Sequence, residues 1–154
     1  LRSLIDTVLN DLDRKEFFIP FTEEELDAMF DEEKVVTYGA YDDDKLVASA
    51  QLYLSENFLS EIKDILDLKD SLVAELGGAV VLKEYRNVGI MKKLIEILIE
   101  EAKKRGYNYL TATVHPDNVA SNNVAASTGA QIVKTVNLSG YLRNVYLLDI
   151  RKSI

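Results

Sequence analysis

The feature that most constrains this chain is an apolar run, Ala79–Leu82, that passes through a short basic turn into a long helical pattern, Ile90–Arg105. The run is β-branched and apolar and predicts a strand, while the spacing of apolar residues after the turn predicts an amphipathic helix. The first backbone N–H groups of such a helix are unpaired and bind phosphate oxygens well. Because the turn carries Lys83 and Arg86 within an acidic chain, we expect it to hold the pyrophosphate of a cofactor.

Composition excludes several classes of protein. The chain has 154 residues, of which 47% are apolar and fall in periodic segments, so we expect one globular domain over residues 1–154. The net charge of −8 opposes binding to nucleic acid or to an anionic membrane, and no apolar run is long enough to span a bilayer. Without cysteine and with one histidine, disulfides and the usual metal sites are excluded. We therefore expect a cytoplasmic protein without a metal.

Hydrophobic periodicity predicts an alternation of helices and strands along the whole chain. Helices are expected over Leu1–Leu12, from the capping box of Thr22 and Glu25 to about Phe30, within Glu56–Leu72, over Ile90–Arg105 and over Val119–Ser127. Strands are expected over Val35–Tyr41, Leu46–Leu54, Val73–Leu82, Tyr107–Val114, Gln131–Leu138 and Leu142–Ile150, with a turn at Ser139-Gly140. This order predicts an α/β layered domain with a mixed, mostly antiparallel sheet, a central parallel strand–helix–strand unit and flanking helices. Gly77-Gly78 predict a bulge in the central strand or a close approach of another backbone.

Two motifs at a fixed separation carry a family resemblance. The first is Arg86-Asn87-Val88-Gly89-Ile90-Met91, which follows a strand and opens a helix, and it fits the pattern Gln/Arg-x-x-Gly-x-Gly/Ala except at Met91. The second follows about thirty residues on, where the expected strand ending at Val114 is followed by Asn118, a short helix and Gly129-Ala130. Over Val35 to about Ile150 the chain resembles the GNAT superfamily of N-acetyltransferases. The resemblance leaves open whether a first strand of the family precedes Leu1.

The resemblance implies acetyl-CoA as co-substrate. It implies that the backbone of Ala79, Val80 and Val81 pairs with the pantetheine arm, and that an N–H near Val81 stabilises the oxyanion. The residues implied to contact the rest of the cofactor are Arg86, Asn87, Val88, Gly89, Ile90, Met91, Lys92, Asn118 and Ser121.

The resemblance also implies direct transfer of the acetyl group to a primary amine of a small molecule or a peptide. Glu75, six positions before Val81, matches the place of a catalytic glutamate in several family members and is our candidate base. Strand alternation puts Glu75 and Val81 on one face unless the Gly77-Gly78 bulge switches it. Family members often form homodimers, so a homodimer is also implied.

One departure weakens the expectation of catalysis. Many family members carry a tyrosine seven residues after the asparagine, where it protonates the departing thiolate, and this chain has Ala125 there. Asn122 is three residues earlier on the same helical face and is our candidate contact for the thiol. An alternative hypothesis from another class is a catalytically weak or inactive domain that binds acyl-CoA as a sensor or interaction module.

Overall fold

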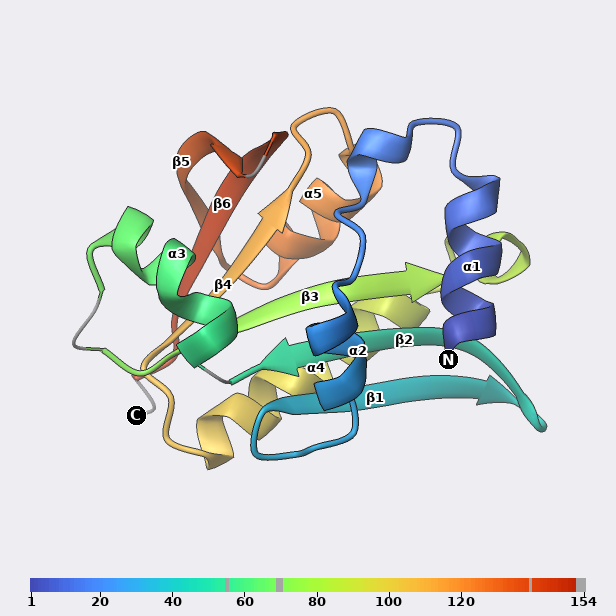
Figure 1. Cartoon of the computed structure of the whole chain (residues 1–154), viewed down its shortest axis with the longest axis horizontal. Coiled ribbons are helices and arrows are strands. Elements are labelled where there is room, and N and C mark those ends of the chain that lie inside the picture. Colours follow the sequence, from blue (N-terminus) through green and yellow to red (C-terminus); the bar gives the residue numbers. More distant parts are fainter. Residues whose placement is uncertain (55, 69–70, 139, 152–154) are drawn as a thin grey trace.

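The computed structural model describes residues 1–54, 56–68, 71–138 and 140–151. Its centre is a six-stranded sheet with the strand order β1-β2-β3-β4-β6-β5 (Figure 1). The strands are β1 (Val35–Asp42), β2 (Lys45–Tyr53), β3 (Val73–Val81), β4 (Tyr109–Val114), β5 (Gln131–Leu138) and β6 (Tyr141–Asp149). The β3–β4 pair is parallel and the other neighbouring pairs are antiparallel. The predicted mixed sheet with a central parallel unit is confirmed.

Helices cover both faces of the sheet. They are α1 (Arg2–Asp11), α2 (Glu23–Ala28), α3 (Glu56–Leu66), α4 (Ile90–Lys104) and α5 (Val119–Ser127), with short 3-10 turns at Lys15–Phe17 and Lys83–Tyr85. In Figure 1, α1, α2 and α3 lie in front of the sheet, and α4 lies behind it. Among the described residues, no helix combines the length and the apolarity needed to cross a bilayer.

The main core lies between α4 and the sheet. Leu98 and Ala102 of α4 are fully buried against Ala48, Ala50 and Leu52 of β2. A second apolar cluster on the opposite face joins α1 to the sheet. Because both faces are buried, the central strands read as nearly continuous apolar runs, as the sequence shows.

Capping explains where two helices begin. Thr22 and Glu25 form the predicted capping box, with Glu25 N donating to Thr22 Oγ1 at 3.0 Å and Thr22 N donating to Glu25 Oε1 at 2.9 Å. Asn118 caps α5 by accepting a hydrogen bond from Ser121 N. The bounds of α5 match the prediction, whereas α2 and α3 end earlier than expected, at Ala28 and Leu66. Ser139 of the predicted last turn lies outside the described residues.

Candidate active site

A cleft opens where two neighbouring strands separate. The parallel register of β3 and β4 extends only from Val73 paired with Tyr109 to Glu75 paired with Thr111. Beyond these pairs the strands diverge, as Figure 1 shows, and a cleft of about 940 Å³ lies between and above them. Its walls come from the second half of β3, from β4 and α5, and from the connector (residues 12–22) that joins α1 to α2.

The predicted bulge lies in β3 at the edge of this cleft. Gly78 and Ala79 lie opposite a single residue of β2, Ala50, because the register shifts there. Gly78 has a φ of +60°, and a Cβ atom on it would lie 2.0 Å from Gln51 Oε1. Only glycine fits both requirements.

The bulge shifts the alternation of side chains along β3 by one residue. Glu75 pairs with Tyr53, which packs against α2, whereas Val81 pairs with Ala48 and packs with the core under α4. Simple alternation, which places Glu75 and Val81 on one face, is therefore wrong for this strand. The extra residue sends the carboxyl of Glu75 to the side of the connector and α2.

Glu75 lies in the cleft beside Tyr53 and Glu25. Burial, with a further contribution from the negative charges of Glu25 and Glu61, raises the pKa of Glu75 to about 8. Burial, followed by the charges of Glu25 and Glu75, also raises the pKa of Tyr53. A carboxyl with such a pKa exchanges its proton close to neutral pH, which suits a general base.

The turn after β3 is held by two side-chain hydrogen bonds. Arg86 Nε donates to Val81 O at 3.3 Å, and Tyr85 OH donates to Asp42 Oδ2 at 2.6 Å. The first bond ties the turn to the end of β3, and the second ties it to the β1–β2 hairpin. The turn is thus fixed relative to the cleft before any ligand binds.

The N-terminus of α4 presents free donors to the cleft. Gly89 precedes the helix with a φ of +83°, no side chain caps it, and a Cβ atom on Gly89 would meet open space. Lys93 N donates to Gly89 O, so the N–H groups of Ile90, Met91 and Lys92 precede the first helical hydrogen bond. Together with the helix dipole, they can hold an anion.

Most residues implied to contact the cofactor line the cleft. They are Ala79, Val80, Val81, Arg86, Asn87, Gly89, Ile90, Met91, Lys92, Asn118 and Ser121. Val88 does not line it, because its side chain is 68% exposed on the outside of the turn.

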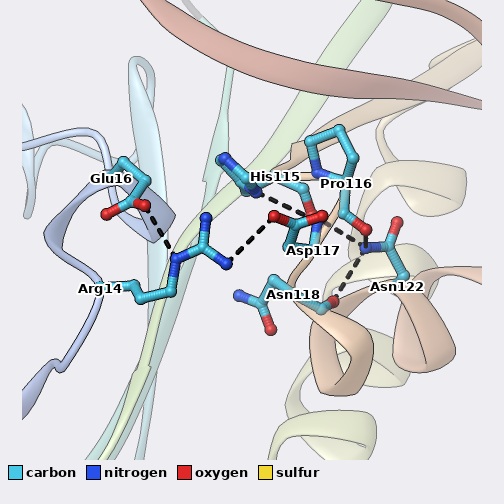
Figure 2. A network of polar contacts seen from close by, with 7 residues as sticks. All are labelled: Arg14, Glu16, His115, Pro116, Asp117, Asn118 and Asn122. Atoms are coloured by element: carbon cyan, nitrogen blue, oxygen red, sulfur yellow. Dashed lines mark hydrogen bonds and ion pairs between the residues drawn. The ribbon is translucent and has the colours of Figure 1, made fainter.

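The side chain of Asn122, predicted to contact the thiol of the cofactor, is instead hydrogen-bonded within the protein. Its Nδ2 donates to His115 O at 3.0 Å and to Asn118 O at 2.8 Å, as Figure 2 shows. Its Oδ1 accepts hydrogen bonds from Tyr146 OH at 2.7 Å and from Asn144 Nδ2 at 3.2 Å. The amide thus joins α5 to β4 and β6 and does not line the cleft, whereas Ala125 does. A thiol contact for Asn122 stays a prediction that these hydrogen bonds do not support.

The connector is fastened across the cleft by contacts with the β4–α5 turn. Arg14 forms ion pairs with two carboxylates, from Nε to Glu16 Oε2 at 2.8 Å and from Nη1 to Asp117 Oδ2 at 3.0 Å (Figure 2). The guanidinium of Arg14 also lies 4.7 Å from the ring centroid of Phe17, and the ring of Phe17 lies 5.0 Å from that of His115. These contacts place the aromatic side chains of the connector over the cleft.

Sequence reasoning missed several residues of the cleft. Glu25 and Tyr53 both line it. In the sequence, Glu25 is fully explained by its capping box and Tyr53 by its place in a strand, so neither signals a functional role. Arg143 and Tyr146 of β6 also line the cleft. A signal for Arg143 was present, because the residues at the same face of β6, Val145 and Leu147, are apolar, and an arginine in that row is unexpected.

Comparisons with known proteins agree with this geometry. A model of the acetyltransferase (GNAT) family matches residues 7–130. No curated protein matches the sequence. Among the described residues, no cluster of His, Asp or Glu is suited to hold a metal ion.

Solved structures share the fold at low sequence identity. The NAA60 protein of Arabidopsis thaliana in complex with acetyl-CoA is 15% identical, with a TM-score of 0.75 over 97% of this chain and 95% of that one. Ribosomal-protein-alanine N-acetyltransferase of Brucella melitensis is 20% identical, with a TM-score of 0.70 over 97% and 93%. The NatC complex bound to Gag peptide and CoA is 18% identical, with a TM-score of 0.73 over 97% and 89%. The family match covers most of the sequence and includes both motifs, and the chain belongs to the acetyltransferase (GNAT) family.

Proposed function

We propose that this protein transfers an acetyl group from acetyl-CoA directly to a primary amine of a small molecule or a peptide. The observation that carries the proposal is that one cleft contains both an uncapped helix N-terminus, at α4, and a carboxyl with a raised pKa, Glu75. The first suits the pyrophosphate of the donor, and the second suits the proton of the acceptor.

The donor half of the cleft is formed by β3 and the turn that follows it. The edge of β3 beyond Glu75 has no paired strand in the β4 register, so the backbone groups on that edge that are not already bonded can pair with a pantetheine arm. Val81 O is already bonded, because it accepts from Arg86 Nε. The N–H groups at the start of α4, with Lys92 beside them, supply donors and positive charge for the pyrophosphate. Acetyl-CoA itself supplies the reactive thioester.

Glu75 takes up the proton in the acceptor half of the cleft. A primary ammonium has a pKa of about 8 to 10, so it must lose a proton before its nitrogen attacks the thioester carbonyl. Glu75, with a pKa of about 8, accepts that proton directly or through water. The new bond is N–C, the bond that breaks is C–S, and the sulfur leaves with the electron pair. A thiol of pKa about 8.5 leaves as thiolate without an obligatory acid, so Ala125 does not prevent the reaction.

Calorimetric titration with acetyl-CoA is the first test, and thiol release with a panel of primary amines is the second. We expect binding at micromolar cofactor and steady thiol release with at least one amine. No heat of binding at high micromolar acetyl-CoA would sink the proposal.

A second candidate function is the binding of acyl-CoA without turnover. The observation that favours it is Ala125, which lines the cleft where a proton donor is usual. The same two measurements separate the candidates, because binding without thiol release for any amine selects the second function, and steady turnover excludes it.

A further inference from the structure

Arg143 is a buried cation on the acceptor side of the cleft. It lies on β6, its side chain is 2% exposed, and it lines the same cleft as Glu75. Arginine keeps its charge in proteins, so this position holds a positive charge away from bulk water. Such a charge is costly to bury unless it is paired.

The protein supplies only part of the pairing. Nη1 of Arg143 donates to Leu142 O at 2.7 Å, and Nη2 donates to Glu16 O at 2.9 Å. The guanidinium also lies 5.4 Å from the ring centroid of Tyr141. These contacts use two of its five donors, and among the described residues no carboxylate forms an ion pair with it. An anion brought by a ligand is the partner that is missing.

The sheet register relates Arg143 to Glu75. Glu75 is level with Thr111 of β4, and Thr113, two residues further along, is level with Val145 of β6. Arg143 is two more residues along and on the same face as Val145. Four residues along the strands and two strands across correspond to about 16 Å between the two backbones.

Both ends of a zwitterion therefore have partners on one face of the sheet. The ammonium end suits the acidic pair Glu25 and Glu75, and the carboxylate end suits Arg143, whose planar guanidinium binds carboxylates with two parallel hydrogen bonds. The separation suits a ligand whose two charges are several bonds apart. The α-amine and carboxylate of a free amino acid share one carbon and do not span it.

We propose that Arg143 binds a carboxylate of the acceptor, and that the acceptor is an extended small amino-carboxylate with its amine at Glu75 and its acid at Arg143. This inference rests on the proposed function, since it names the substrate class of the same cleft. It assigns to Arg143 a role in acceptor specificity in addition to its hydrogen bond with the connector.

The test compares acids with their own amides. Triglycine with triglycinamide, lysine with lysinamide, and 6-aminohexanoate with its amide are titrated by calorimetry into protein saturated with CoA, so that binding is read without turnover. For at least one pair we expect the acid to bind about tenfold or more tightly than the amide, as charge-assisted bidentate pairing implies. In Arg143→Gln the two affinities should become equal, and in Arg143→Lys the preference should be partly kept.

A matched control removes the same charge from Arg151, which lies two residues after the end of β6. Arg151 pairs with Asp149 at 2.7 Å, is exposed, and does not line the cleft. Arg151→Gln should therefore keep the acid preference of the wild type. The thermal unfolding midpoint of each variant is recorded, so that a loss of fold is recognised as such.

Each outcome decides one question. If no acid is preferred over its amide, or if the preference survives Arg143→Gln, the inference is overturned whatever the catalytic activity. If Arg143→Gln weakens acids and amides equally, Arg143 only holds the connector, and the inference is again overturned. Failure of the proposed function shows separately, as no thiol release with acetyl-CoA for any amine, while the acid–amide comparison with CoA still reports on Arg143.

Discussion

Gly78 of β3 lies against Gln51 of β2 so closely that a methyl group at position 78 would come within 2.0 Å of the Gln51 amide oxygen. The same methyl group would come within 2.7 Å of the ring of Phe21 in the connector. The bulge is therefore built on a contact between two strands and the connector above them. The buried amide of Gln51 has no hydrogen-bond partner among the described residues. Its side chain is therefore held there by van der Waals packing and not by hydrogen bonds.

Gly78→Ala should destabilise the protein by about 3 kcal/mol, because the substitution adds a steric overlap to an unfavourable positive φ. Gly106→Ala is the matched control, since Gly106 has a φ of +81° and open space around a Cβ atom. Gly106→Ala should lower the free energy of unfolding by only about 1 kcal/mol. Urea unfolding of both variants measures the difference, and equal costs would contradict the crowding described at Gly78.

Gly89→Glu should abolish acetyl-CoA binding in calorimetry, because it places a carboxylate at the free N–H groups that begin α4. Gly106→Glu introduces the same residue at a positive φ and in open space, but away from the cleft. The control should bind acetyl-CoA within about twofold of the wild type. Equal loss in both variants would assign the effect to misfolding and not to the anion site.

Glu75→Gln should lower kcat/KM by about 10²–10⁴-fold while sparing acetyl-CoA affinity, as loss of a general base predicts. Because the pKa of Glu75 is raised to about 8, its carboxylate form is scarce at pH 6 and becomes abundant above pH 8. The wild-type kcat/KM should therefore rise with pH through about 8 as the carboxylate of Glu75 forms. A pH–rate profile of the variant should lose the contribution of Glu75 and keep only that of the amine, and an unchanged profile would rule Glu75 out as the base.

Glu25→Gln should move the rise of the wild-type pH profile to lower pH. Burial is the main reason for the raised pKa of Glu75, and the charge of Glu25 is the next. Glutamine removes the charge yet still serves a capping box, so α2 should keep its start. The measurement is the apparent pKa of kcat/KM in the two proteins, and a shift to higher pH would contradict the predicted repulsion.

Asn122→Ala should reduce stability by about 2 kcal/mol, because it removes the hydrogen bonds that the side-chain amide donates to His115 O and Asn118 O and the one that it accepts from Tyr146 OH. If its contacts are purely structural, the folded variant should keep the wild-type kcat. Thermal unfolding and thiol release on the same preparation provide both numbers. A large fall in kcat with unchanged stability would instead support the predicted contact with the thiol.

Local patterns predicted most elements because local chemistry determines them. The capping box of Thr22 and Glu25 involves residues three apart and is present as predicted. The start of α5 at Val119 was also predicted, and the structure adds that Asn118 caps it through Ser121 N. The glycine pair predicted a bulge in β3, but not which way the strand would face after it. That direction depends on the pairing with β2, which is not a property of β3 alone.

The contacts that close the cleft depend on partners far apart in the sequence. Arg143 Nη2 reaches Glu16 O across 127 positions, and Arg14 reaches Asp117 from the other end of the chain. Neither pair leaves a periodic pattern, because each depends on one side chain meeting one loop. Asn122 shows the same limit at short range: helical spacing put it near Ala125, while the turn before α5 engaged its amide.

The single extra residue in β3 also decides which of its side chains α1 can use. Before the bulge the even-numbered Ala74 and Leu76 pack under α4, whereas after it the even-numbered Val80 and Leu82 pack against α1. Under simple alternation Val80 and Leu82 would turn to the layer of α4, and α1 would lose two of its apolar partners on the sheet.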